Sequence, residues 1–137
     1  MMEDNGLIRS AGERPFWLAD EQKLAILWPL GIQRCFYIYE VGEETARGQH
    51  RHHRCHMALN SPHGSVTIYA QTPDESFTYQ LDKTQPWLVL PPSVWRMMYD
   101  FTPGALLVVL ASEPYDPQDC ITGPYRPLLP YGSTISH

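Results

Sequence analysis

The chain has 137 residues, and 10 Lys and Arg against 15 Asp and Glu give it a formal net charge of −5. This length suits one domain, its 43% hydrophobic residues exclude a disordered chain, and the acidic balance disfavours a nucleic-acid or acidic-membrane partner. The longest apolar run, at 105–111, is far shorter than the roughly 20 residues that cross a membrane. We therefore expect a single domain over 1–137 with neither nucleic acid nor membrane as a partner.

The predicted elements are short strands separated by turns. Residues 1–12 are polar and contain glycine, which predicts a loose leader. Strands are then expected at 16–19 and 23–28, the second of which ends before Pro29. The clearest strand is at 33–41, where aromatic and β-branched residues dominate. Residues 49–59 contain neither Pro nor Gly, and they predict a strand with one face turned toward a ligand.

The second half of the chain continues this pattern. Strands are predicted at 65–70, 76–81, 87–90, 94–101 and 105–111, with Pro, Gly or Asp in the turns between them. We expect a short helical turn after Asp116 and an irregular, proline-rich tail over 123–137. Short strands at regular spacing, with no long helical period, are typical of an all-β sandwich or barrel.

The cysteines bear on cellular location. Cys35, Cys55 and Cys120 are widely spaced and form no Cys-x-x-Cys pair, so neither a disulfide framework nor a cysteine zinc site is indicated. The acidic N-terminus is not followed by the apolar region of a secretory signal. A cytoplasmic location is the simplest expectation, because free thiols persist in a reducing compartment.

Five of the six histidines fall between positions 50 and 63. In a regular strand every second side chain shares a face, and here that face comprises His50, His52, Arg54 and His56. So polar a face makes a poor core, because each group needs a hydrogen-bond partner or water. We expect it to line a wet cavity inside a barrel.

Three interpretations of this face remain open. It could be a solvated edge strand that is rich in histidine. It could be a metal site, because the spacing of His50, His52 and His56 resembles the first metal-binding motif of cupins, with His56 in place of the usual Glu. It could also carry out metal-free acid–base chemistry, because the near-neutral pKa of histidine suits proton transfer to and from a substrate.

Five segments of the chain together resemble the motifs of one known family. They read QRCFYI at 33–38, RGQHRH at 47–52, LNSPHGSV at 59–66, PSVWRMMYDF at 92–101 and VVLASEPYDPQD at 108–119. In order and spacing they resemble the sugar-nucleotide 3,4-ketoisomerases, a cupin family that includes the dTDP-4-keto-6-deoxyglucose isomerases and the WxcM-like domains. The most characteristic element is the arrangement Arg47-Gly48-x-His50-x-His52, which resembles the family motif RGxHxH.

The resemblance implies both a fold and a reaction. The fold is a small cupin (RmlC-like) jelly-roll barrel that pairs into a homodimer. The activity is that of an isomerase without metal or other cofactor. It moves the keto group of a dTDP-linked 4-keto-6-deoxyhexose from C4 to C3 through an enediol. Such a reaction belongs to deoxysugar biosynthesis for a surface polysaccharide or a glycosylated metabolite.

The resemblance also assigns roles to individual residues. It implies that His50 transfers the proton, with His52 beside it as a second catalytic residue. The expected substrate-binding residues are Arg47, Arg54, Trp95, Arg96, Phe36 and Tyr37. A core position remains an alternative for Trp95, as does a solvated surface position for Arg54. Arg96 resembles the family version associated with a gluco-configured product, and it disfavours a metal because a guanidinium is a poor ligand.

Some positions depart from the family pattern. Phe36 replaces the first Tyr of a Tyr-Tyr pair, which removes a hydroxyl from the expected site, and Met57 replaces a Gln. Segments 14–17 and 119–122 also differ from the family. Two alternatives therefore stay open beside the isomerase. One is a non-catalytic sugar-nucleotide-binding cupin, and the other is a metal-dependent cupin that uses His50, His52 and His56.

Overall fold

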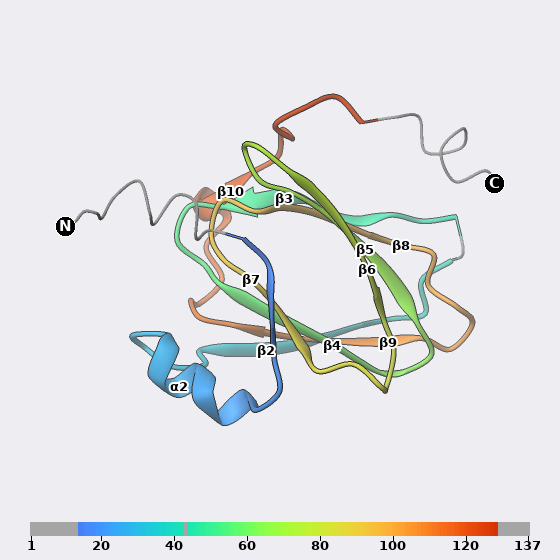
Figure 1. Ribbon diagram of the computed structural model, residues 1–137, viewed down its shortest axis with the longest axis horizontal. Coiled ribbons are helices and arrows are strands. Elements are labelled where there is room, and N and C mark those ends of the chain that lie inside the picture. The colour runs from blue at the N-terminus through green and yellow to red at the C-terminus, as the bar shows by residue number, and fades with distance from the viewer. Residues whose placement is uncertain (1–13, 43, 129–137) are drawn as a thin grey trace.

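The computed structural model describes residues 14–42 and 44–128, and within them two five-stranded antiparallel sheets lie face to face (Figure 1). The first sheet has the order β1-β7-β4-β9-β2 and the second β10-β3-β8-β5-β6. The strands are β1 (Phe16–Leu18), β2 (Arg34–Tyr39), β3 (Arg47–His52), β4 (Met57–His63), β5 (Val66–Gln71), β6 (Ser76–Leu81), β7 (Trp87–Leu90), β8 (Trp95–Tyr99), β9 (Leu106–Ala111) and β10 (Cys120–Ile121). The all-β architecture predicted from the sequence is confirmed.

The main core fills the space between the sheets. Strand alternation turns the apolar side chains of both sheets inward, including Leu59, Leu88, Leu107, Ile68 and Met98. Each fully buried aliphatic side chain of this kind stabilises the fold by about 1.5–3 kcal/mol relative to an exposed one. The core therefore fixes which face of each strand points inward, and with it the direction of the polar side chains at the barrel's open end.

Most expected elements form within two residues of their predicted bounds. The helical turn expected after Asp116 is the 3-10 turn Pro117–Asp119. Residues 123–128 form neither helix nor strand. The leader at 1–12 and the last part of the predicted tail, 129–137, lie outside the described residues.

The strand expected at 23–28 is wrong, because this segment is helical. A 3-10 turn (Glu21–Lys23) leads into the short helix α2 (Leu24–Leu27). The carboxylate of Asp20 caps the turn by accepting a hydrogen bond from the backbone N–H two residues later, at 2.9 Å. The apolar run fits a strand or a helix equally well, and this cap is the local signal that favours the helix.

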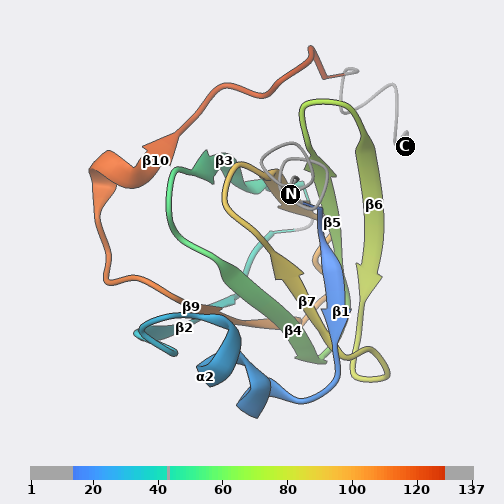
Figure 2. The same cartoon turned by 60° about the vertical axis from the view of Figure 1, so that its left-hand side comes forward.

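The helical segment buries one face against the outer side of the first sheet (Figure 2). Leu24 and Trp28 lie one turn apart, so they share a face and are both buried, while Ile26 between them is 85% exposed. Their partners on the sheet are Ala58, Val89 and Leu110. None of the helices in the described residues is long and apolar enough to span a membrane.

The single strand expected at 49–59 is also wrong, because the chain leaves the sheet after His52 and re-enters it at Met57. The backbone N–H groups between them bond to the C-terminal segment instead of to a neighbouring strand. The carboxylate of Asp119 accepts from the N–H of Arg54 at 2.9 Å and from that of Cys55 at 3.1 Å. A residue more than 60 positions away therefore ends β3, which sequence alternation cannot reveal.

Candidate active site

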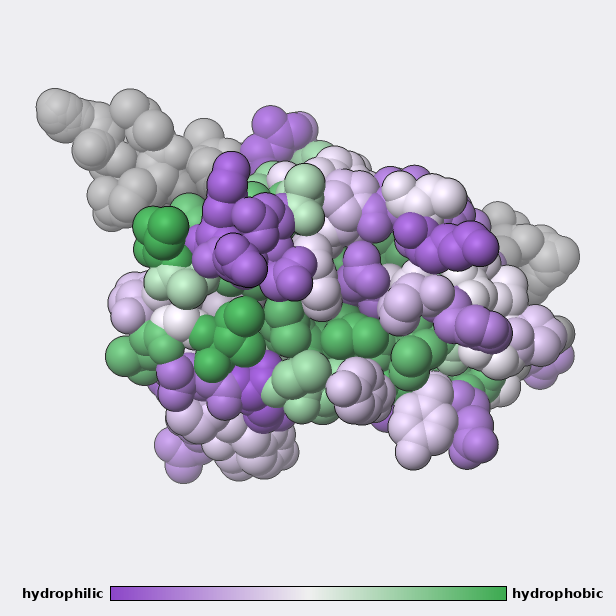
Figure 3. Space-filling model, turned by 90° about the horizontal axis from the view of Figure 1, so that it is seen from below, coloured by the Kyte–Doolittle hydropathy of each residue, from purple (hydrophilic) through white to green (hydrophobic). Residues whose placement is uncertain are grey.

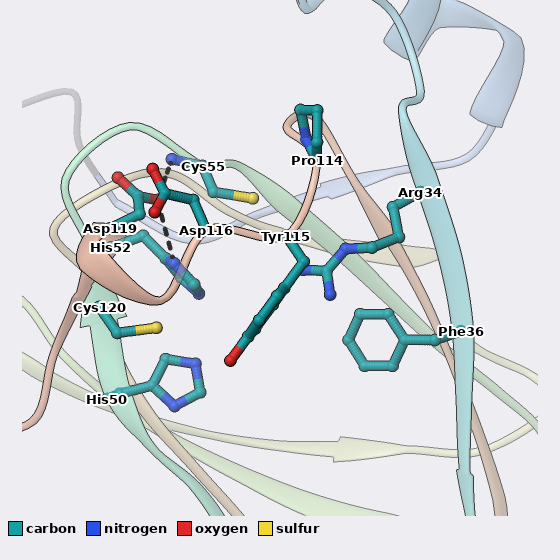
Figure 4. A pocket seen from close by; sticks show the side chains of 10 residues that line it. All are labelled: Arg34, Phe36, His50, His52, Cys55, Pro114, Tyr115, Asp116, Asp119 and Cys120. Atoms are coloured by element: carbon teal, nitrogen blue, oxygen red, sulfur yellow. Dashed lines mark hydrogen bonds and ion pairs between the residues drawn. The ribbon is translucent and has the colours of Figure 1, made fainter.

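A cavity of about 320 Å³ opens between β2 on one side and β3 with the segment 114–120 on the other (Figure 4). It is lined by Arg34, Phe36, His50, His52, Cys55, Pro114, Tyr115, Asp116, Asp119 and Cys120. Ligand pockets commonly measure about 300–1,000 Å³ and combine apolar walls with a few convergent polar groups. This cavity has both features.

A β-bulge in β3 sets the direction of the histidines. Gly48 and Gln49 have φ angles of +83° and +61°, and the register against β8 shifts between Gly48 and His50. The extra residue places Arg47 and His50 on one face, although a spacing of three would separate them in a regular strand. A Cβ on Gly48 would lie 3.3 Å from the backbone oxygen of Arg96. Backbone conformation and close approach therefore both favour glycine here.

The imidazoles of His50 and His52 lie side by side in the pocket wall, with ring centroids 4.8 Å apart. Nδ1 of His50 lies 3.0 Å from the carbonyl oxygen of Gly48, and Nδ1 of His52 lies 3.2 Å from a carboxylate oxygen of Asp119. Since both oxygens only accept, Nδ1 is the donor in each ring and Nε2 keeps its lone pair. Nε2 of His52 is buried and has no hydrogen-bond partner among the described residues. Two acceptor nitrogens are therefore available at one place.

The surroundings keep both imidazoles neutral. Burial and the nearby Arg96 guanidinium lower the pKa of His50 below its usual 6.5. Burial is also the main reason that the pKa of His52 falls to about 3; Arg96 and His50 add to the effect, and Asp119 opposes it. A neutral imidazole can accept a proton, so both rings are in the basic form at neutral pH.

Arg96 is fully buried inside the barrel. Its Nε donates to the carbonyl oxygen of Val94 at 3.1 Å, and its Nη1 lies 3.4 Å from the sulfur of Met57. Its Nη2 has no hydrogen-bond partner in the part of the chain that the structure describes. Burial lowers the pKa of Arg96 to about 10, which leaves it charged at neutral pH. Arg96 does not line the cavity, but its positive charge acts on both imidazoles from inside the barrel.

The opposite wall carries a second guanidinium. The Arg34 guanidinium carbon lies 4.8 Å from the ring centroid of Phe36 and 5.4 Å from that of Tyr115. Figure 4 shows the Tyr115 ring between this guanidinium and the histidines, with its hydroxyl pointing into the pocket. Phe36 contributes only an apolar ring to the cavity, whereas Tyr115 brings a phenol to it.

Three of the expected site residues, His50, His52 and Phe36, line the pocket, and others do not. Tyr37 follows strand alternation onto the outer face of β2, where it is 59% exposed. Trp95 lies on the face of β8 opposite to Arg96, is 1% exposed, and donates from its indole N–H to the carbonyl oxygen of Thr122 at 2.8 Å. The tail of the chain therefore covers Trp95 on the outside of the barrel. This agrees with the alternative that Trp95 is a buried structural residue.

Arg54 and Arg47, which were also expected to bind the substrate, lie outside the cavity lining as well. Arg54 lies beyond the end of β3, and its guanidinium is paired with the carboxylates of Asp116 at 3.0 Å and Asp119 at 3.5 Å. These pairs leave it poorly placed to receive a phosphate. Arg47 is exposed at the start of β3, on the face that His50 shares, but it does not line the cavity.

The histidine set His50, His52 and His56 does not assemble. The chain turns out of the sheet after His52, and the ring of His56 packs against Trp28 at a centroid distance of 6.0 Å. In the part of the chain that the structure describes, the one group of metal-ligating side chains that does form contains Cys120 in place of His56. The metal interpretation in its predicted form is therefore wrong.

Sequence reasoning did not assign Arg34, Tyr115, Asp119 or Cys120 to the site. Arg34 could have been found from strand parity, because it lies two residues before Phe36 and so shares its face. Tyr115 and Asp119 lie in one of the family-like segments, but nothing local indicates that this segment folds across the end of β3.

Two antiparallel sheets that enclose a histidine-lined pocket define a small cupin-type β-barrel protein. The family model for FdtA, described as WxcM-like, C-terminal, matches residues 18–126. The chain therefore belongs to this family, as the sequence motifs indicated.

Named relatives agree with this membership. The TDP-4-oxo-6-deoxy-alpha-D-glucose-3,4-oxoisomerase of Aneurinibacillus thermoaerophilus is 32% identical over 93 residues, which are 68% of this chain and 67% of that protein. A crystal structure of a histidine-to-asparagine mutant of the 3,4-ketoisomerase QdtA from Thermoanaerobacterium thermosaccharolyticum, in complex with TDP-4-keto-6-deoxyglucose, is 41% identical. It has a TM-score of 0.66 and covers 69% of each chain.

A further solved structure supports the fold. The TDP-quinovose 3,4-ketoisomerase WlaRB of Campylobacter jejuni is 28% identical, with a TM-score of 0.68 over 77% of this chain and 78% of that one. The predicted cupin barrel is confirmed by these matches. The named relatives are isomerases, which is the enzyme class that the resemblance implied.

Proposed function

We propose that this protein is a 3,4-ketoisomerase that moves the keto group of a TDP-linked 4-keto-6-deoxyhexose from C4 to C3 by histidine-mediated proton transfer. The observation that carries the proposal is the pair of neutral imidazoles, His50 and His52, whose Nε2 atoms are free at one pocket wall. The names of the relatives supply the substrate class, because they act on or bind TDP-linked keto-deoxysugars.

The reaction requires a base and then an acid at neighbouring carbons. Nε2 of His50 takes the proton from C3, the C–H electrons form the C3–C4 double bond, and the C4 carbonyl oxygen becomes an enolate oxygen. A proton is then delivered to C4, and the proton of the C3 hydroxyl is transferred to the C4 oxygen. This leaves a ketone at C3 and a hydroxyl at C4 with no net change in protons. His50 is the better base because it is less buried than His52 and so more open to the cavity.

Two further groups support this chemistry. The positive charge of Arg96, which acts on the imidazoles from inside the barrel, favours the negative charge of the enediolate, because a fixed charge is weakly screened in a dry site. Asp119 holds His52 in one tautomer and orientation, so that its Nε2 can pass a proton to or from the enediol.

The opposite wall is suited to hold the substrate. The planar guanidinium of Arg34 can bind phosphate or sugar oxygens through two parallel hydrogen bonds, and the aromatic rings on either side keep it in place. The Tyr115 hydroxyl faces the histidines across the cavity and can bond a sugar hydroxyl. The substrate ring would then lie between the base and this phenol.

The direct test is incubation with TDP-4-keto-6-deoxyglucose and detection of the 3-keto isomer by NMR, with a known isomerase as positive control. His50→Asn should lower the rate by about 10²–10⁴-fold, which is the usual contribution of a general base. His63→Asn is the matched control, because His63 is exposed, lies outside the cavity lining, and its ring bonds to the Gly104 carbonyl. No conversion by the unmodified protein would refute the proposal for this substrate.

A second candidate function is supported by Phe36 and Met57, where residues typical of the family are replaced. A non-catalytic binder of sugar nucleotides would keep the pocket and lose turnover. It would show a thermal shift with TDP, but neither isomerisation nor uptake of solvent deuterium at C3 and C4.

We also propose that the protein is a homodimer. Apolar side chains gather on the face around α2 and β2 (Figure 3), and the exposed ones include Ile26, Leu27, Leu30, Tyr37 and Tyr39. Such patches usually mark an interaction surface, and β2 is an unpaired sheet edge within the described chain. A monomer in light scattering would contradict this. The three cysteines are free, which fits a reducing, cytoplasmic location.

A further inference from the structure

His50, His52 and Cys120 form a cluster of nitrogen and sulfur donors at the pocket wall. One donor atom from each residue lies within 4.8 Å of the other two. The cluster arises because β10 pairs with β3 so that Cys120 lies directly opposite His52, which puts both side chains on the same face. In Figure 4 the sulfur of Cys120 and the two rings point toward one another.

The two imidazoles are held as metal ligands usually are. Histidine ligands commonly donate the N–H of their second nitrogen to a carboxylate or a backbone carbonyl, which fixes the ring and frees the coordinating lone pair. His52 does this toward Asp119 and His50 toward Gly48. Nε2 of His52 is, in addition, a buried polar atom without a partner, in a side chain that is only 6% exposed. No group in the described part of the chain donates a hydrogen bond to this atom, so its lone pair is open to a ligand.

We propose that His50, His52 and Cys120 bind Zn²⁺ or a similar thiophilic divalent ion, and that the bound ion inhibits the enzyme. The thiol releases its proton to solvent on coordination, and the open cavity leaves a fourth position for water. Zinc–nitrogen and zinc–sulfur bonds of about 2.0–2.3 Å space tetrahedral ligands about 3.3–3.6 Å apart, so donors that lie as much as 4.8 Å apart must close by up to about 1.5 Å. The inhibition rests on the proposed function, because the ion would occupy the lone pairs that move the proton.

Neighbouring charges decide which ions fit. The positive charge of Arg96 acts on both rings and opposes any cation. The thiolate of Cys120 and the carboxylate of Asp119 behind His52 offset it. Hard ions such as Mg²⁺ prefer oxygen ligands and gain little from imidazole and thiolate, so they should not bind.

The binding test uses full-length untagged protein, stripped with chelator, and Co²⁺ as the spectroscopic probe, with Zn²⁺ in competition. One Co²⁺ per chain should give a thiolate-to-cobalt charge-transfer band that Zn²⁺ removes and Mg²⁺ does not. Cys120→Ser should lose the band and weaken Co²⁺ binding by roughly 30-fold or more, because a thiolate ligand is lost. Cys35→Ser is the matched control, because Cys35 is an exposed free cysteine that does not line the cavity. Unchanged binding in Cys120→Ser, or no charge-transfer band in the unmodified protein, would overturn the site.

The activity test compares each protein with itself, with and without Zn²⁺. The unmodified enzyme and Cys35→Ser should lose at least about ten-fold in rate at a Zn²⁺ concentration that Cys120→Ser tolerates, and chelator should restore it. Equal inhibition of all three proteins would refute inhibition at this cluster. A charge-transfer band in a protein that isomerises nothing would refute the proposed function while the metal site stands. Isomerisation by a protein that shows no charge-transfer band would refute the metal site while the proposed function stands.

Discussion

The carboxylate of Asp119 accepts a hydrogen bond from Nδ1 of His52 at 3.2 Å, across 67 residues of sequence. The same carboxylate accepts hydrogen bonds from the backbone N–H groups of Arg54 and Cys55. One buried side chain thus ends β3 and also fixes the tautomer of an imidazole in the pocket. The local fold and the chemistry of the site depend on the same group.

Replacing Asp119 should therefore affect both stability and rate. Asp119→Asn presents an amide that can donate to Nδ1, which favours the wrong tautomer of His52, and it weakens the bonds to the β3–β4 turn. We expect a loss of about 1–3 kcal/mol in the free energy of unfolding, measured with urea, and a fall in kcat of about 10–100-fold. Asp74→Asn is the control, because Asp74 is exposed in the turn between β5 and β6 and lies outside the cavity lining. Equal effects of the two substitutions would contradict the role of Asp119.

The pH dependence of the reaction should reflect the lowered pKa of His50. Because the base must be neutral, a pKa below 6.5 keeps it active under more acidic conditions than an ordinary histidine would allow. The acid limb of kcat/KM should therefore lie below pH 6.5. Arg96→Met removes one cause of the lowering, so the limb should move upward, whereas Arg96→Lys keeps the charge and should hold it low. An unchanged acid limb in Arg96→Met would exclude an effect of the Arg96 charge on the pKa of His50. Cooperative thermal unfolding of this variant would show that it is still folded.

The hydroxyl of Tyr115 should matter for turnover. Tyr115→Phe removes the phenol that faces the histidines and leaves the ring beside Arg34, so the packing survives. We expect kcat to fall about ten-fold or more, measured by the rate of 3-keto product formation. Tyr39→Phe removes a hydroxyl from the exposed outer face of β2 and serves as control. An unchanged kcat in Tyr115→Phe would show that the reaction does not use the Tyr115 hydroxyl.

Arg34 should determine affinity for the substrate more than the rate of its conversion. Arg34→Gln removes the guanidinium between Phe36 and Tyr115, and we expect KM to rise about ten-fold or more with a smaller change in kcat, because charge-assisted bonds to phosphate are lost. Arg34→Lys keeps the charge without the planar fork and should be intermediate. A larger KM effect from Arg47→Gln than from Arg34→Gln would move the phosphate site to the start of β3.

The sequence by itself determined the barrel and its histidine face. Alternating apolar residues and frequent turn residues predict most of the strands, because a strand's side-chain period is local and is written into the chain. The pair His50 and His52 follows from the same rule, since a spacing of two keeps side chains on one face. Gly48 also signals a special position, although the bulge itself becomes clear only from the register with β8.

Only the tertiary structure decided what surrounds the histidines. Asp119, Cys120 and Tyr115 reach the pocket because the segment after β9 folds back across the end of β3, which no local pattern encodes. The same contacts separate His56 from the other two histidines by capturing the backbone between them. Likewise α2 forms where the sequence predicted a strand, since Leu24 and Trp28 find a sheet face to cover. Local periodicity fixes the direction of a side chain within its element, but its neighbours depend on hydrogen bonds and burial between distant segments.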